Sequence, residues 1–153
     1  MVTLDTNVLT YATAARSDAK VERARDLVVR TLRAPSSIHL LQTLAEFSHV
    51  ATRKAKIPVN DIRRIIDAWR AVLPVQASDD SDLSMALDAV RAKQLPFWDA
   101  MLWAAAKRAG VTHILTEDLQ DGFVLQGVAF INPFRQADDK LIDQILPLGA
   151  AIR

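Results

Sequence analysis

Four carboxylates lie inside or at the edge of apolar runs of this chain, and no basic residue stands near them in sequence to neutralise their charge. They are Asp5, Glu46, Asp99 and Asp118. Burying an ionised carboxylate without a partner costs roughly several kcal/mol. If the four side chains converge in the fold, we expect them to share a divalent cation, and hard oxygen ligands favour Mg²⁺ or Mn²⁺ over zinc. This interpretation makes the protein a metal-dependent enzyme.

Short apolar segments alternate along the chain with longer segments whose apolar residues have helical spacing. Strands are predicted at Val2–Asp5, Ile38–Leu41, Leu73–Val75, Thr112–Thr116 and Gly127–Ile131. Helices are predicted at Thr6–Ala14, Lys20–Leu32, Thr43–Lys54, Pro58–Val72, Ser78–Lys93, Pro96–Ala109 and Asp139–Leu146. This alternation is typical of an α/β fold in which helices cover both faces of a parallel sheet.

The bulk composition is that of one compact globular domain, because 50% of the 153 residues are apolar and 24% are charged. The absence of cysteine excludes disulfides and thiolate metal sites. No apolar run reaches the roughly 18 residues needed to cross a bilayer, and no secretion signal is visible, so we expect a cytoplasmic protein without a membrane anchor. The net charge of +1 has two interpretations. Either acids gathered in one cleft leave the remaining surface basic, or both signs are evenly mixed.

The predicted order of elements gives the four acids comparable positions. Asp5 and Asp118 lie at or just beyond the ends of predicted strands, and the other two lie in the first turns of helices. Functional groups in a parallel sheet gather outside the carboxyl ends of the strands, so we expect all four at one edge.

Each acid also has an ordinary explanation. Asp5 can cap the following helix, and Asp99 can favour the dipole of its own helix. Glu46 has capping-box spacing from Thr43, and Asp118 can form an Asx-turn. Taken as a set, however, the four positions favour a metal site over coincidence.

Four short motifs around these acids resemble a known family in their order and spacing. They are Asp5-Thr6-Asn7-Val8-Leu9, Ala45-Glu46-Phe47, Phe97-Trp98-Asp99-Ala100 and Thr116-Glu117-Asp118-Leu119-Gln120-Asp121-Gly122. They look like the motifs of PIN-domain ribonucleases, above all the VapC toxins of bacterial toxin–antitoxin pairs. The resemblance implies a single PIN-like nuclease domain over residues 1–153, with a three-layer α/β/α fold and a central five-stranded parallel sheet. It also implies magnesium-dependent cleavage of RNA.

The same resemblance implies a role for each matching residue. The metal ligands and catalytic acids would be Asp5, Glu46, Asp99 and Asp118. Asn7 and Thr116 would be polar groups that orient these carboxylates. For Asp121, an additional acid of the site and a solvated turn residue are both open. The chemistry agrees independently, because clustered carboxylates repel one another and a divalent cation relieves that repulsion, activates water for in-line attack and neutralises phosphodiester charge.

Basic and aromatic residues beside the motifs are candidates to contact RNA. Arg53 and Lys54, about two helical turns after Glu46, are placed to hold a flanking phosphate. A solvated helix end whose cations favour the helix dipole is the alternative. For Trp98, a ring in the core is favoured over a base-stacking platform. Core positions are also expected for Trp69 and Trp103, and structural or surface positions for His39, His49 and His113, which lack zinc-site spacing.

Other functions fit parts of the sequence. A haloacid-dehalogenase-like phosphohydrolase also places an Asp after its N-terminal strand, but it would use a second Asp where this chain has Asn7. A PIN-type nuclease of RNA processing that is not a toxin is a further alternative. So is a non-catalytic binding module on the same scaffold, although a degenerate module would be expected to lose acids.

A VapC-like toxin would have a characteristic partner. It would bind a small antitoxin whose C-terminal segment fills the acidic groove and places an Arg or Lys where the metal sits. The apolar helix from Ile62 to Val72 leaves room for a homodimer interface, although core packing is the stronger interpretation for any one residue. Transfer, ribosomal and messenger RNA are all compatible substrates.

Overall fold

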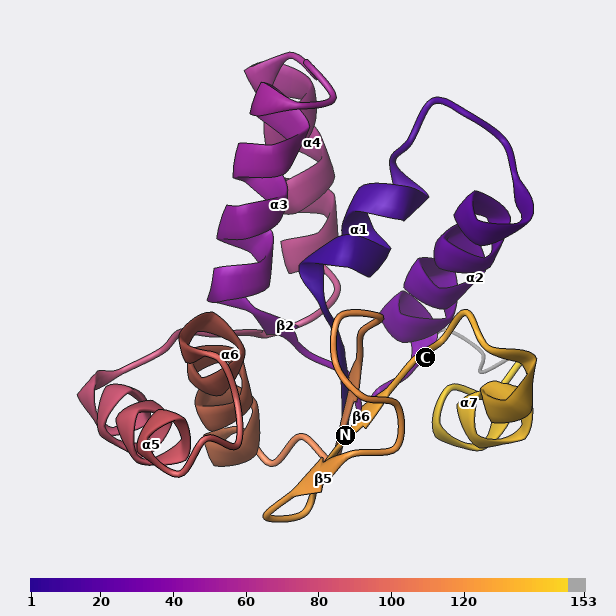
Figure 1. The fold of residues 1–153 in the computed structure, drawn as a ribbon. Helices are drawn as coiled ribbons and strands as arrows, with labels where there is room; N and C mark the ends of the chain where they lie inside the picture. The colour runs from indigo at the N-terminus through magenta and orange to yellow at the C-terminus, as the bar shows by residue number, and fades with distance from the viewer. Residues whose placement is uncertain (149–153) are drawn as a thin grey trace.

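The computed structural model describes residues 1–148 and is an α/β fold, as the sequence predicts (Figure 1). Its strands are β1 (Val2–Leu4), β2 (His39–Leu40), β3 (Val75–Gln76), β4 (His113–Leu115), β5 (Val124–Leu125) and β6 (Val128–Ile131). Its helices are α1 (Thr6–Ala12), α2 (Ala19–Arg33), α3 (Leu41–Arg53), α4 (Val59–Arg70), α5 (Asp80–Arg91), α6 (Phe97–Arg108) and α7 (Asp139–Ile145), with a 3₁₀ turn at Gln136–Asp138. Within residues 1–148, none of the helices combines the length and hydrophobicity that a membrane span requires.

The central sheet has four strands in the order β1-β4-β6-β5. Strands β1, β4 and β6 are parallel, and their register pairs Leu4 with Leu115 and Leu115 with Ile131. Strand β5 pairs antiparallel with β6. The hairpin turn between them consists of Gln126 and Gly127, both at positive φ (47° and 86°), which suits the twist of hairpin strands. Strand β5 was not predicted, because two residues are too few to show an alternating pattern.

The predicted five-stranded parallel sheet is wrong in its strand count, although the α/β class is confirmed. All five predicted strands form, but β2 and β3 pair with each other in a separate two-stranded parallel sheet. In the described chain, a single bridge between Val2 and Ser37 connects this small sheet to β1. Strands β2 and β3 have two residues each, so the chain leaves for the next helix before a longer ladder can form.

Two groups of buried side chains cover the two faces of the central sheet. On one face, Leu4, Leu115 and Ile131 pack with residues of α1, α2, α3, α4 and α7. On the other face, Ile114 and Phe130 pack with residues of α5 and α6. Successive strand residues therefore point to opposite faces, as the pleat requires. Helices lie on both sides of the sheet, as predicted (Figure 1).

The start of α3 differs from the prediction. This helix begins at Leu41, so Thr43 lies inside it and its hydroxyl donates to a carbonyl of the preceding turn at 2.8 Å. The predicted capping box of Thr43 and Glu46 is therefore wrong, and Glu46 is free to face another part of the molecule. A capping box forms instead at α5, between Asp79 and Asp82.

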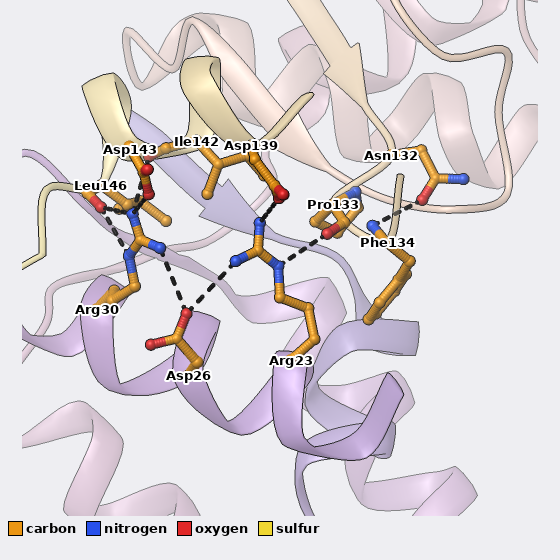
Figure 2. Close-up of polar contacts among 10 residues, drawn as sticks. All are labelled: Arg23, Asp26, Arg30, Asn132, Pro133, Phe134, Asp139, Ile142, Asp143 and Leu146. Carbon is orange, nitrogen blue, oxygen red and sulfur yellow. Dashed lines mark hydrogen bonds and ion pairs between the residues drawn. The ribbon is translucent and has the colours of Figure 1, made fainter. Parts of the chain in front are cut away.

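The C-terminal part of the described chain is fastened to α2 by a buried arginine (Figure 2). Arg30 is only 5% exposed and donates to the Leu146 carbonyl at 2.7 Å and to the Ile142 carbonyl at 3.3 Å. It also pairs with Asp143 at 2.7 Å. The last carbonyls of a helix have no partner within that helix, so a guanidinium at this position satisfies the acceptors at the end of α7.

A second arginine of α2 holds the chain just after β6. Arg23 donates to the Pro133 carbonyl at 3.1 Å and pairs with Asp139 at 2.7 Å. Asp26 lies between the two arginines, 3.6 Å from Arg23 and 3.3 Å from Arg30 (Figure 2). The two arginines together fix the segment from residue 133 to residue 146 against α2.

Replacing Arg30 by alanine should lower the free energy of unfolding by about 2 to 4 kcal/mol, because buried carbonyls lose their donor and a cavity opens. Urea denaturation measures the change. Arg33→Ala, at an exposed position in the same helix, is the matched control and should change stability by less than about 0.5 kcal/mol. A loss for Arg30→Ala as small as that of the control would contradict this account.

Candidate active site

The first part of the site forms where two adjacent parallel strands end. The Asp5 amide donates to the Leu115 carbonyl at 3.0 Å, so the ladder of β1 and β4 continues one residue beyond β1. There the Thr116 hydroxyl donates to Asp5 Oδ2 at 2.7 Å. Asp5 Oδ1 accepts from the Thr6 amide at 2.6 Å and so caps α1. The predicted capping role and the predicted strand-end position therefore belong to the same side chain.

Thr116 also connects Asp5 to the fourth acid. Its hydroxyl oxygen accepts from Asn7 Nδ2 at 3.2 Å and from the Asp118 amide at 3.2 Å. Asn7 Nδ2 donates in addition to Asp118 Oδ2 at 3.1 Å. Asn7 and Thr116 thus form hydrogen bonds with two of the four carboxylate-bearing residues, Asp5 and Asp118.

The other two acids come from α3 and α6. Glu46 Oε2 accepts from the Thr6 hydroxyl at 3.0 Å, and Glu46 Oε1 accepts from Gln42 Nε2 at 2.9 Å. Gln42 Nε2 also donates to the Trp98 carbonyl at 3.0 Å, which ties α3 to the first turn of α6 where Asp99 lies. Thr6 and Gln42 were not predicted as site residues. The signal for Gln42 was its i, i+4 spacing from Glu46, which places the two side chains side by side on a helix.

All four carboxylates open into one pocket of about 320 Å³. It is lined by Asp5, Thr6, Asn7, Thr10, Tyr11, Glu46, Val50, Lys54, Asp99 and Asp118. Within residues 1–148, none of the four acids forms an ion pair with a lysine or arginine. Lys54 lines the pocket, but Arg53 is not among the described lining residues. The α3 side of the pocket follows the i, i+4, i+8 spacing of Glu46, Val50 and Lys54, and Arg53 lies one residue off this row.

Burial and mutual repulsion disfavour the charged forms of these acids. Burial raises the pKa of the Asp5 carboxyl from 3.8 to about 6, and the charges of Asp118 and Glu46 contribute to the rise although hydrogen bonds oppose it. Burial likewise raises the pKa of Asp99, again with a contribution from Asp118 and Glu46. A positive ion in the pocket would relieve both effects, because it favours the ionised carboxylates.

Asp121 lies apart from this pocket. Its Oδ1 accepts from the Asn132 amide at 2.8 Å and its Oδ2 pairs with Arg135 at 2.8 Å. The side chain therefore links the turn after β4 to the chain leaving β6. Of the two open interpretations of Asp121, these contacts favour a structural role in the turn.

A lysine neutralises the remaining acid of the same loop. Glu117 lies between Thr116 and Asp118 and accepts hydrogen bonds from Lys20 and from the Tyr11 hydroxyl. The Lys20 ammonium also lies 4.3 Å from the centre of the Tyr11 ring. These contacts give Glu117 a cation of its own, in contrast to Asp118 beside it, and they anchor the loop that carries Asp118.

The donor set of the pocket fits a small, hard dication. Among residues 1–148, no group of three or more histidine, aspartate or glutamate side chains is placed closely enough to hold a metal ion together. Mg²⁺ commonly keeps several waters and binds through one or two carboxylates. An open pocket of carboxylates therefore fits Mg²⁺ better than zinc, which in structural sites needs four closely placed ligands.

The positions of the tryptophans correct one prediction. Trp69 and Trp103 are 7% and 1% exposed, as expected for core residues. Trp98 is 66% exposed, so the favoured prediction of a core ring is wrong. Helical side chains lean toward the N-terminus of their helix, and Trp98 in the first turn of α6 has no earlier turn to cover it.

The PIN domain family model matches residues 2–123 of the sequence. The chain belongs to the PIN-domain family. The match contains all four carboxylates of the pocket, and it ends just before β5. In a comparison with curated proteins, none matches this PIN-domain chain.

Solved structures share the fold of this PIN domain at low sequence identity. One is VapC20 of Mycobacterium tuberculosis, a sarcin-ricin loop cleaving toxin, with 18% identity and a TM-score of 0.62 over 77% of this chain and 90% of that chain. Another is a toxin–antitoxin complex from Klebsiella pneumoniae, with 16% identity and a TM-score of 0.65 over 88% and 98%. A third is FitAcB from Neisseria gonorrhoeae, with 16% identity and a TM-score of 0.58 over 88% and 99%.

The raised pKa of Asp5 predicts that the difference in stability between the PIN domain and its Asp5→Asn variant changes with pH. Because the folded-state pKa of Asp5 lies near 6 and the unfolded value near 3.8, the folded protein holds this proton more tightly. Asp5 therefore contributes stability below pH 4 that is lost as pH rises through 6. In metal-free buffer, the free energy of unfolding of Asp5→Asn relative to wild type should rise by about 2 to 3 kcal/mol between pH 4 and pH 7.

Thermal or urea denaturation with EDTA at several pH values measures this difference. Asp88→Asn, at a surface site where the side chain is 70% exposed, is the control and should give a nearly constant difference. Burial lowers the pKa of His39 to about 4, so His39 makes the protein more stable as pH rises. Because wild type and variant share His39, its contribution cancels in the difference between them. A difference for Asp5→Asn that is independent of pH would show that Asp5 is not held in a disfavoured charged state.

Proposed function

We propose that this PIN domain is a magnesium-dependent endoribonuclease. The observation that carries the proposal is the pocket in which carboxylates from four separate segments meet without a basic ion-pair partner among the described residues. Such an arrangement is costly unless a cation compensates it. The family membership supports the same reaction class, namely hydrolysis of a phosphodiester bond.

Asp5, Glu46, Asp99 and Asp118 are the proposed metal ligands and catalytic acids. Bound Mg²⁺, or Mn²⁺ in its place, would lower the pKa of a water and neutralise the charge that develops on the phosphodiester. The chain itself supplies orientation, because Asn7 and Thr116 hold Asp5 and Asp118 in fixed positions. A carboxylate of the set would accept the proton of the attacking water.

Lys54 is the residue proposed to contact substrate phosphate. It lines the carboxylate pocket from the C-terminal end of α3. A cation at the rim of an acidic pocket can hold a neighbouring phosphate of the RNA backbone while the metal takes the scissile one. Phosphate binding by Arg53 has less support, because Lys54 lines the pocket and Arg53 is not among the described lining residues.

The toxin of a toxin–antitoxin pair is the proposed biological role. The fold likeness to VapC20 and to the Klebsiella complex supports it. The partner would be an antitoxin whose C-terminal segment fills the pocket and offers a cation to the four carboxylates in place of the metal. Copurification with the product of a neighbouring reading frame would support this role, and its failure would favour an RNA-processing nuclease instead.

A homodimer is also part of the proposal, although less of the predicted interface from Ile62 to Val72 is exposed than such an interface would need. Ile62 and Trp69 of α4 are buried in the core, whereas Val72 just after the helix is 57% exposed. Sedimentation of the purified chain at several concentrations distinguishes monomer from dimer.

Asp99→Asn and Asp5→Asn should each reduce RNA cleavage by far more than about 100-fold, since residues that only orient metal ligands already cost about 10- to 100-fold when replaced. Cleavage of a fluorescent single-stranded RNA in Mg²⁺ measures the rate. Asp88→Asn on α5 removes an exposed charge at a residue that does not line the pocket and should cleave at the wild-type rate. Undiminished cleavage by both pocket variants would refute the assignment.

Mg²⁺ should raise the melting temperature of the wild type and raise it less in Asp5→Asn, because an ion that binds only the folded state stabilises it. At about 100 times its Kd, the ion adds about 2.7 kcal/mol, or roughly 5 to 10 °C for a chain of this size. Differential scanning fluorimetry with and without MgCl₂ measures both shifts. Equal shifts in the two proteins would count against direct ligation by Asp5.

A further inference from the structure

A second hollow opens beside the carboxylate pocket. It has a volume of about 720 Å³ and shares Thr6, Glu46 and Val50 with the smaller pocket, so the two adjoin at these residues. Its other walls include Gln42, His49 and Trp98. A substrate whose reacting phosphate lies at the four acids therefore has one of its neighbouring groups at the mouth of this hollow.

Trp98 presents its ring to this hollow from a fixed backbone. Trp98 is 66% exposed. Exposed tryptophans are enriched at surfaces that bind a ligand or partner. The backbone carbonyl of Trp98 accepts a hydrogen bond from Gln42 Nε2 at 3.0 Å. The Phe97 and Trp98 rings pack edge-to-face, with their centres 5.1 Å apart. The backbone of Trp98 is therefore tied to α3, its ring packs beside Phe97 of α6, and most of the residue stays exposed.

We propose that this hollow binds the nucleobase adjacent to the cleaved phosphate of a single-stranded RNA, by stacking on Trp98. The chemistry of the walls matches a base, because an aromatic face stands beside two side chains that can hydrogen-bond to a base edge, Gln42 and His49. Aromatic stacking tolerates every base, so the site would position the strand rather than select one sequence. The two amide hydrogens of Gln42 are donated to Glu46 and to the Trp98 carbonyl, so its Oε1 and the His49 ring are the groups left to meet a base edge.

This inference rests on the proposed nuclease function and adds a substrate subsite to it. A stacked base is bound equally in the ground state and in the transition state, so its loss should raise KM and leave kcat nearly unchanged. Loss of a metal ligand acts on kcat instead. The two classes of variant are therefore distinguishable by the parameter that changes.

The test is steady-state cleavage of short single-stranded RNAs in Mg²⁺ by wild type, Trp98→Ala and Trp98→Phe. Trp98→Ala should raise KM by about 5- to 150-fold with kcat within about twofold, as expected for one lost base stack. Trp98→Phe should retain most of the affinity, because it keeps an aromatic face. Leu87→Ala, at a 51% exposed apolar position on α5, is the matched control and should leave both parameters unchanged.

An abasic RNA provides a readout that a structural role of Trp98 would not change. Removing the base beside the cleaved bond should raise KM for the wild type about as much as Trp98→Ala does, and it should add little in Trp98→Ala. Unchanged KM for Trp98→Ala on natural RNA would overturn the nucleobase site, even if that variant then lost affinity for an antitoxin. A wild type that cleaves no RNA in Mg²⁺ would overturn the nuclease function itself, and the subsite with it.

Discussion

The parallel pairing of β1 with β4 is the interaction on which the site depends. It aligns Leu4 with Leu115, so the residues that follow them, Asp5 and Thr116, emerge together at one edge of the sheet and bond at 2.7 Å. From this pair the other contacts extend: Asn7 reaches Asp118, and Thr6 reaches Glu46. A slip of one residue in this pairing would turn Leu4 and Leu115 away from their own core. The core and the carboxylate pocket therefore require the same register.

The elements predicted well from the sequence are those whose pattern is decided locally. Strand β1 and its terminal Asp5 are an apolar run ending on an acid, and the long helices have clear apolar spacing. The pairing partners of β2 and β3 could not be predicted, because two-residue strands carry no signal about which neighbour they will join. The edge strand β5 was missed for the same reason, although the Gln126-Gly127 turn was a signal for a hairpin.

Within the site, the acids were predictable and their surroundings only partly so. An acid in an apolar run, such as Asp99, can be recognised from the sequence alone. The contact of Thr6 with Glu46 joins residues forty positions apart, and only the folded chain determines it. Trp98 illustrates the opposite error, because an apolar sequence context suggested burial while its place in the first turn of α6 exposed it. Burial depends on which neighbouring element covers a residue, and that information is not local.

The contacts of Arg30 have a consequence for the order in which the molecule is completed. Its partners on α7 lie more than a hundred residues later in the chain, so during synthesis α2 leaves the ribosome long before the carbonyls that its guanidinium will meet. Until then the buried guanidinium of Arg30 lacks the carbonyls and the carboxylate that it meets in the folded protein. The final tightening of this face must await the synthesis of Ile142 and Leu146, since domains fold as units. The docking of α7, which follows every strand of the sheet in the chain, would then be the event that closes this side of the protein.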